Sequence, residues 1–290
     1  MIKLIDRSTR VLVQGITGSQ GSFHTELMQE YGTIIAAGVT PGKGGENINS
    51  IPVYDTITEA QINHQLDASI IFVPAKFTLD AALEAIEAGL NPVTIITEGV
   101  PVKDSIQIMA YAKQNDVTII GPNCPGLIKP EECKLGIMPS QIFRKGNIGV
   151  VSRSGTLFYE IAAHITRTGL GQSMCIGLGG DPIVGIDFID ALKWFENDPE
   201  TEAVALIGEI GGDAEEKAAL YIADGKFSKP VAGYIAGRSA IPGKRMGHAG
   251  AIIQGASGTA LSKISALRNV GVKVGDQPMD VARALKELVT

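Results

Sequence analysis

The sequence predicts two doubly wound α/β domains in tandem, and three observations predict this fold. Short runs of β-branched residues alternate along the chain with segments of helical spacing. The order strand, Gly/Ser/Thr turn, helix occurs twice, over residues 11–24 and 150–163. The 290 residues also include 35 glycines and only 5% aromatic residues, a composition typical of folds with many tight strand-to-helix turns.

The first half predicts one parallel sheet. Its strands are expected at residues 10–14, 34–39, 68–73, 92–97 and 117–120. Residues 77–88 and 105–114 carry small and aliphatic side chains three and four positions apart, which predicts helices packed on that sheet. Two prolines and two glycines within residues 121–126 interrupt the series. We therefore expect one domain over residues 1–126 and a second over 127–290.

The second half repeats the pattern. Strands are expected at residues 148–152, 173–178, 203–208 and 230–235, and a closing helix at 279–288. A hydrophobic share of 44% is enough to bury a core in each domain.

Composition excludes several classes of function. The net charge of -6 and the lack of a long basic run argue against nucleic acid and anionic membranes as partners. Three cysteines without a Cys-x-x-Cys pair favour neither a disulfide framework nor a zinc site, and no metal site is expected on this chain. The N-terminus does not read as a signal peptide, and no apolar run approaches a membrane span. We expect a cytoplasmic protein, although a processed form in the mitochondrial matrix would look the same.

A glycine-rich turn follows the first strand. Gly15, Gly18 and Gly21 lead into a helix, so backbone N–H groups and the helix N-terminus form a potential anion site. The spacing differs from the dinucleotide fingerprint, and a tight structural turn is the alternative. The second strand is followed by Lys43 rather than by an acidic residue, which favours CoA or NADP over NAD, unless Lys43 is a solvated loop residue.

The second domain carries groups suited to phosphoryl chemistry. Ser154 and its neighbours between a strand and a helix offer hydroxyls and N–H groups to a phosphate, or simply cap the helix. Glu209 follows a strand, at the edge where α/β folds place functional groups. His248, with Gly247 and Gly250 close by, is a candidate covalent phosphate carrier or acid/base, because a neutral imidazole nitrogen is nucleophilic near pH 7. Taken alone, a histidine of an ordinary surface loop is the alternative. If Glu209 accepts a hydrogen bond from Nδ1–H, Nε2 is left as the nucleophile.

Taken in order, these motifs resemble the α subunit of succinyl-CoA synthetase over the whole chain. The resemblance implies an N-terminal Rossmann-like CoA-binding domain and a flavodoxin-like ligase domain with a phosphohistidine loop. It assigns CoA binding to Thr17, Gly18, Ser19, Gln20, Lys43, Ile96, Thr97 and Glu98. It gives Tyr159 the acyl-substrate position, His248 the phosphate, Glu209 the orienting role, and Ser154, Gly155 and Thr156 the phosphate cradle. Ala256 and Ser257 stand where relatives often carry glycine and lysine.

The implied reaction is the reversible formation of succinyl-CoA from succinate and CoA at the expense of ATP or GTP, a citric acid cycle step. The chain has no Gly-x-x-x-x-Gly-Lys-Ser/Thr run, so the nucleotide and Mg²⁺ are expected on an ATP-grasp β subunit, in an αβ or α₂β₂ complex. Two alternatives stay open: a related acyl-CoA ligase for another acid, and a non-enzymatic CoA- or NADP-binding regulatory module that does not need His248.

Overall fold

The computed structural model describes residues 4–241, 246–253 and 258–289. The chain divides into two compact units, a first unit of Ile2–Met138 with Ile183–Gly185, and a second unit of Pro139–Pro182 with Ile186–Thr290. The first unit thus extends beyond residue 126, where the sequence analysis set the boundary. No helix within the described residues is long and apolar enough to cross a membrane.

The first unit is built on a sheet with the order β3-β4-β2-β1-β5-β6-β7. All neighbouring pairs are parallel except β3 with β4. The strands are β1 (Arg10–Gln14), β2 (Ile34–Val39), β3 (Asn47–Ile48), β4 (Ile51–Tyr54), β5 (Ala68–Ile71), β6 (Val93–Ile95) and β7 (Ile119–Ile120). Since β2 and β5 flank β1 on opposite sides, the strand order reverses at β1, the place where open α/β sheets bind ligands.

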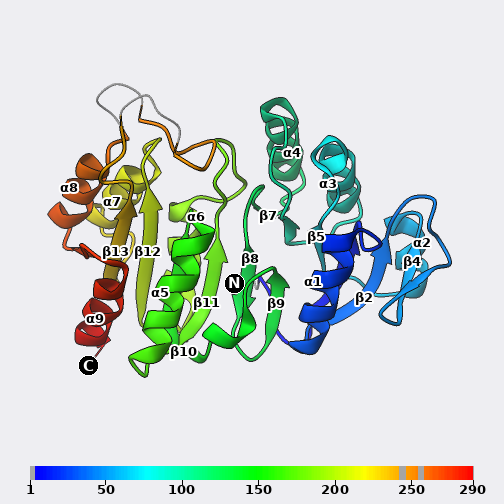
Figure 1. Cartoon of the computed structure of the whole chain (residues 1–290), viewed down its shortest axis with the longest axis horizontal. Helices are drawn as coiled ribbons and strands as arrows, with labels where there is room; N and C mark the ends of the chain where they lie inside the picture. Colours follow the sequence, from blue (N-terminus) through cyan, green and yellow to red (C-terminus); the bar gives the residue numbers. More distant parts are fainter. Residues whose placement is uncertain (1–3, 242–245, 254–257, 290) are drawn as a thin grey trace. The chain divides into compact units, whose positions relative to one another are not determined.

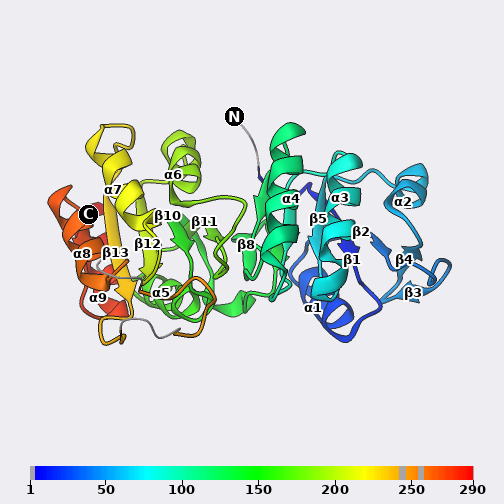
Figure 2. The ribbon, with the colours of Figure 1, turned by 90° about the horizontal axis from the view of Figure 1, so that it is seen from above.

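Helices cover both faces of this sheet. Figure 2 shows α1 (Ser19–Glu30) on one face, and α2 (Ile57–Asn63), α3 (Thr78–Glu87) and α4 (Val102–Gln114) on the other. Short apolar side chains of α3 and α4 pack on buried strand residues such as Leu12, Ile71 and Ile95. An antiparallel hairpin of β8 (Gly126–Lys129) and β9 (Cys133–Gly136) follows within this unit.

The second unit contains a parallel run of strands in the order β14-β13-β12-β10-β11. These are β10 (Lys145–Ser152), β11 (Gln172–Gly177), β12 (Ala203–Glu209), β13 (Val231–Ala236) and β14 (Lys273–Val274). Helices α5 (Gly155–Arg167) and α9 (Pro278–Val289) pack together on one face. The other face carries α6 (Phe188–Asn197), α7 (Ala214–Ala223) and α8 (Ala260–Asn269). The strand order reverses between β10 and β12.

The predicted elements are confirmed. Strands β1 and β2 have the predicted bounds, and the other predicted strands and helices differ by a few residues at their ends. The strands are buried along nearly their whole length, which is why they read as continuous apolar runs. Strands β3, β4, β8 and β9 were not predicted, because strands of two to four residues leave too short a pattern in the sequence.

Candidate active site

The glycine turn of the first unit is shaped for a close approach to its backbone. Gly15 has a positive φ of 80°, and Gly18 is the N-cap of α1 without a side-chain cap. A Cβ on Gly21 would lie 2.1 Å from the carbonyl oxygen of Gly15, so only glycine lets α1 begin this close to β1. Ser19 and Gln20 in the first turn are exposed, and Thr17 is half-buried. The first-turn N–H groups of a helix have no partner within it, so this turn can receive an anion.

Lys43 lies on the loop that follows β2, at the same carboxyl edge of the sheet. The carboxylate of Asp55 accepts hydrogen bonds from the backbone N–H groups of Gly42, Lys43 and Gly44 at 2.6, 3.0 and 2.9 Å. These bonds hold the pKa of Asp55 below its ordinary value, the one from Gly44 most strongly. The Lys43 ammonium is exposed and pairs with Glu46 at 2.9 Å. The loop is therefore fixed by its backbone, while its cation is accessible to an anionic ligand.

Residues Ile96, Thr97 and Glu98 follow β6 at this edge. The Ile96 N–H donates to Ile71 at 3.2 Å, and the Thr97 hydroxyl donates to the Val73 carbonyl at 2.7 Å. Ile96 and Thr97 are half-buried, whereas Glu98 is exposed. Because β2, β1, β5 and β6 are neighbours, the structure brings all the predicted CoA-site residues to one edge of the first unit.

The phosphate-site residues predicted in the second unit surround the start of α5. Ser154 is the N-cap, and its hydroxyl accepts a hydrogen bond from the Leu157 N–H at 3.4 Å. Ser154 therefore caps the helix through its side chain. Gly155 and Thr156 are the first two helical residues, so their N–H groups have no intrahelical partner. Tyr159, one turn further along α5, is half-buried beside Phe158.

His248 and Glu209 meet in this unit. The imidazole Nδ1 lies 2.9 Å from Oε2 and 3.1 Å from Oε1 of Glu209, the last residue of β12. The side chain of Glu209 is 7% exposed and that of His248 is 31% exposed. The hydrogen bond to the Glu209 carboxylate raises the pKa of His248 above 6.5, against a smaller lowering by burial. A carboxylate at Nδ1 fixes the tautomer with the proton on that nitrogen and leaves the lone pair on Nε2.

Glycines at two strand ends make room for the histidine turn. A Cβ on Gly180 would lie 2.4 Å from the imidazole Cγ, and one on Gly211 would lie 2.0 Å from the Gly250 carbonyl oxygen. The Gly250 N–H donates to the Gly180 carbonyl at 3.1 Å. The turn is therefore held by its backbone against the ends of β11 and β12. Ala256 and Ser257 lie outside the described residues.

Arg153 belongs to this site, although the sequence analysis gave it no role. Its guanidinium lies 3.6 Å from Oε1 of Glu209 and donates to the Gly211 carbonyl at 3.1 Å. Its position directly after β10, at the reversal of strand order, is the signal that would have identified it. The Gly179–Gly180 and Gly211–Gly212 pairs after two other strands are a second signal of the same kind.

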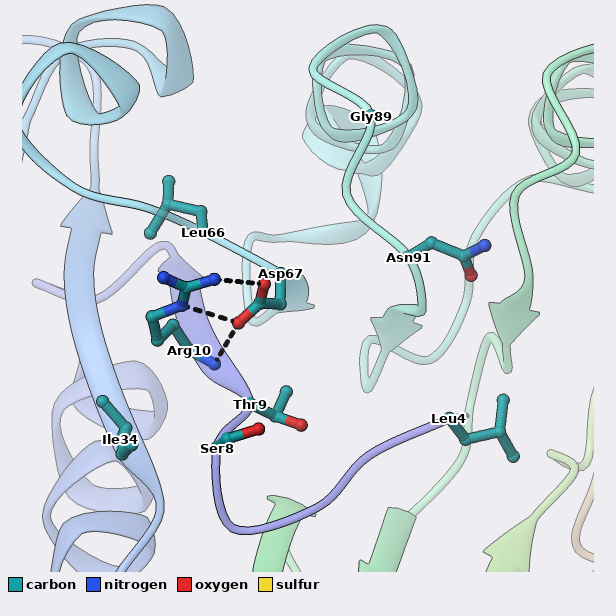
Figure 3. Close-up of a pocket in the computed structure, with 9 residues that line it drawn as sticks. All are labelled: Leu4, Ser8, Thr9, Arg10, Ile34, Leu66, Asp67, Gly89 and Asn91. Atoms are coloured by element: carbon teal, nitrogen blue, oxygen red, sulfur yellow. Dashed lines mark hydrogen bonds and ion pairs between the residues drawn. The ribbon is translucent and has the colours of Figure 1, made fainter. Parts of the chain in front are cut away.

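A hollow in the first unit lies away from these residues. Its volume is about 730 Å³, and Figure 3 shows the Arg10–Asp67 ion pair, at 2.7 Å, among its lining residues. Arg10 and Ile34 are the first residues of β1 and β2, so this hollow is at the amino edge of the first sheet. Among the described residues, no group of three or more His, Cys, Asp and Glu side chains is placed to hold a metal ion.

Known families match both units. A CoA binding domain model matches residues 6–99, and a CoA-ligase model matches residues 151–273. The second match runs from the end of β10 to the start of β14 and includes Arg153, Glu209 and His248. The expected Rossmann-like CoA-binding domain followed by a second α/β domain is therefore confirmed.

Two curated relatives match almost the entire chain. The α subunit 2 of ADP-forming succinate–CoA ligase from Archaeoglobus fulgidus is 55% identical over 289 residues, which cover 100% of both chains. The α subunit from Methanothermobacter thermautotrophicus is 58% identical over 283 residues, 98% of this chain and 96% of the relative.

Solved structures of longer proteins share the fold of this chain. Methanosaeta concilii ATP citrate lyase, in a complex with (3S)-citryl-CoA, is 25% identical with a TM-score of 0.91, over 99% of this chain and 51% of the lyase. This chain thus spans about half of that longer protein. An acetyl-coenzyme A synthetase from Ca. Korarchaeum cryptofilum shares the fold at 18% identity, with a TM-score of 0.74 over 96% of this chain and 60% of the synthetase. From its sequence, its two α/β units and its relatives, the chain belongs to the family of succinate–CoA ligase α subunits.

Proposed function

We propose that this chain is the α subunit of an ADP-forming succinate–CoA ligase and that His248 carries the phosphoryl group. The overall reaction converts succinate, CoA and ATP into succinyl-CoA, ADP and phosphate. The observation that carries this proposal is the 2.9 Å contact between Nδ1 of His248 and the buried carboxylate of Glu209. A histidine held in this way presents Nε2 as a nucleophile, which a purely CoA-binding module would not need.

The reaction consists of two phosphoryl transfers followed by one acyl transfer. In the first, Nε2 of His248 bonds to the terminal phosphorus of ATP while the bond to the ADP oxygen breaks. A carboxylate oxygen of succinate then takes the phosphoryl group from Nε2, which gives succinyl phosphate. Finally, the CoA thiolate attacks the acyl carbon, and phosphate leaves. Glu209 stabilises the imidazole with its proton on Nδ1 throughout these steps.

The start of α5 is suited to the phosphoryl group between these transfers. The N–H groups of Gly155 and Thr156 and the positive end of the helix dipole favour a dianion without a permanent cation bound to it. Ser154 contributes its backbone and keeps the helix start in place, because its hydroxyl serves as the N-cap. We assign Tyr159, on the same helix, to the acyl substrate.

CoA is assigned to the carboxyl edge of the first unit. The residues proposed to bind it are Thr17, Gly18, Ser19, Gln20, Lys43, Ile96, Thr97 and Glu98. The open N-terminus of α1 fits a phosphate, since Gly18 offers no side chain that would occupy the site. Lys43 adds a cation on a rigid loop, which suits a phosphorylated ribose or a pyrophosphate.

The nucleotide is assigned to a partner. A β subunit of the ATP-grasp class would hold ATP with Mg²⁺, which neutralises phosphate charge during transfer. This chain contributes the phosphate-accepting histidine and the CoA site. We propose an αβ or α₂β₂ complex, which sizing of the reconstituted enzyme would distinguish.

Labelling with γ-³²P-ATP tests the proposal. The wild-type chain, reconstituted with its β subunit, should acquire an acid-labile label, and His248→Asn should abolish it. His164→Asn is the matched control, because His164 lies in the last turn of α5, near Glu160 and far along the helix from Ser154, and should leave the label unchanged. Full labelling of the His248→Asn enzyme would overturn the proposed function.

A panel of acids tests the substrate. The same site would serve another carboxylic acid, and one structurally similar protein is an ATP citrate lyase. Initial rates of CoA-dependent ADP release with succinate, malate, citrate and acetate should be highest with succinate. A clear preference for another acid would contradict succinate as the substrate and would leave the proposed phosphorylation of His248 unaffected.

A further inference from the structure

A pair of opposite charges lies buried beneath the histidine site, outside the mechanism described above. The side chains of Lys263 on α8 and Glu215 on α7 are 0% exposed. The Lys263 ammonium donates to Oε2 of Glu215, to Oε2 of Glu216 at 3.1 Å and to the Gly212 carbonyl at 3.1 Å. Burying two charges costs free energy even when they neutralise each other. A purely stabilising role would therefore not explain this buried ion pair.

Glu215 connects this pair to the backbone of Glu209. Its Oε1 accepts a hydrogen bond from the Glu209 N–H at 3.0 Å. The carboxylate can reach β12 because residue 208 is glycine, where a Cβ would lie 2.6 Å from both Cγ and Oε1 of Glu215. The Glu209 N–H is thus held by a charged group, and Glu209 also pairs with Ala236 of β13 in the sheet.

Glu215 also faces Arg153, the cation next to Glu209. Oε1 of Glu215 lies 3.6 Å from Nη1 of Arg153, and Oε1 of Glu209 lies 3.6 Å from Nη2. Arg153 is 11% exposed, and a Cβ on Gly250 in the histidine turn would lie 2.9 Å from its Nη2. The charges therefore alternate from Lys263 through Glu215, Arg153 and Glu209 to His248.

We propose that Glu215 is a positioning residue for the Glu209–His248 pair: neutralised by Lys263, its carboxylate holds the Glu209 backbone and shares Arg153. This inference rests on the proposed phosphohistidine function of His248. If Arg153 paired with Glu209 alone, it would compete with Nδ1–H for that carboxylate. By dividing the guanidinium between two carboxylates, Glu215 leaves Glu209 available to the imidazole.

The charges that face His248 set the direction of the expected effect. Glu209 at the end of β12 and Asp181 after β11 favour the imidazolium, whereas Arg153 after β10 disfavours it. Glu215 on α7 and Lys263 on α8 act behind Arg153 and Glu209. Removing the negative charge of Glu215 strengthens the effect of Arg153, so the pKa of His248 should fall.

Glu215→Gln tests this role, because the amide keeps the shape and an oxygen that can accept from the Glu209 N–H. With the full enzyme, the pKa of His248 measured by histidine NMR should fall by about half a unit or more. The acidic limb of the phosphorylation rate should move to lower pH by the same amount, and the plateau rate should fall about tenfold. Glu216→Gln is the matched control. Among the described residues, the Glu216 carboxylate contacts Lys263 and Ser262 and is not paired with Arg153 or Glu209, so the His248 pKa and the phosphorylation rate should stay at their wild-type values.

A second variant separates positioning from folding. Glu215→Gln leaves Lys263 with Glu216 as its only carboxylate partner among the described side chains, which lowers thermal stability. Glu215→Gln/Lys263→Met removes both buried charges and should recover the melting temperature while the lower His248 pKa persists. An unchanged pKa and pH limb in the folded variants would overturn the proposal. If the wild-type enzyme acquired no label from γ-³²P-ATP, the proposed function would be overturned. The NMR titration of His248 would still test the role of Glu215.

Discussion

The starts of α1 and α5 are the same structural motif in two different surroundings. Each follows a buried strand at a reversal of strand order, and each offers first-turn N–H groups to an anion. The start of α1 is exposed and has no side-chain cap. The start of α5 has a serine cap, and Arg153, Glu209 and His248 belong to the same unit.

This difference indicates what turns an anion site into a reactive one. Backbone N–H groups alone can hold a phosphate, which suits the recognition of CoA. The proposed chemistry requires a nucleophile with a fixed tautomer, and His248 lies against a buried carboxylate that has its own charge partner in Arg153. We therefore expect substitutions in the second unit to change rates and those in the first unit to change CoA affinity.

Among variants that keep His248, the largest effect is expected for Glu209→Gln. The amide can place an NH₂ against Nδ1 and no longer fixes its proton, so phosphorylation should fall about 10²- to 10⁴-fold. CoA affinity, measured by calorimetry, should stay the same. A similar loss in both measurements would break the proposed division of labour.

The same variant has a pH signature in stability. The raised pKa of His248 stabilises the folded state below the unfolded pKa of about 6.5, and this contribution is lost as pH rises through the folded pKa. In thermal unfolding, Glu209→Gln should therefore lose the additional stability that the wild-type protein shows at pH values below about 6.5. Identical pH profiles for the two proteins would contradict the ion pair.

A pair of glycine substitutions compares the two helix starts directly. Gly21→Ala would put a Cβ 2.1 Å from the Gly15 carbonyl oxygen, whereas a Cβ on Gly155 would have no atom within 4 Å. We expect Gly21→Ala to cost about 2 to 3 kcal/mol in denaturant unfolding and to weaken CoA binding. Gly155→Ala should be neutral or gain up to about 1 kcal/mol. Equal unfolding free energies for Gly21→Ala and Gly155→Ala would contradict the close packing of Gly21 against Gly15.

The smallest effect is expected for Lys43→Ala. Its ammonium is half-exposed and paired with Glu46, so its loss should weaken CoA binding about three- to tenfold at low salt and less at high salt. Lys113→Ala, at the end of α4, is the exposed-lysine control and should leave CoA affinity unchanged. A salt-independent effect of Lys43→Ala would indicate a contact other than an ion pair.

The sequence predicted the parallel strands and the residues at their carboxyl ends. It did not predict the charged side chains that contact those residues, such as Glu215 and Arg153. Strands such as β1 and β2 are continuous apolar runs, and Glu209 stands where such a run ends. Glu215 and Lys263 are 48 positions apart, so nothing local shows that they neutralise each other. Charged residues on a helix ordinarily indicate a solvated face, and that expectation fails for Glu215 in α7. Arg153 was missed for the same reason, since its partners come from β12 and α7.

The most direct test of the central claim is the identity of the phosphorylated nitrogen. Because the Glu209 carboxylate lies 2.9 Å from Nδ1, we expect phosphate to bond to Nε2 of His248. The ³¹P and ¹⁵N NMR spectra of the phosphorylated enzyme, labelled with ¹⁵N-histidine, distinguish the two nitrogens through their coupling to phosphorus. Coupling to Nε2 alone is the predicted result, and a phosphoryl group on Nδ1 would contradict the role assigned to Glu209.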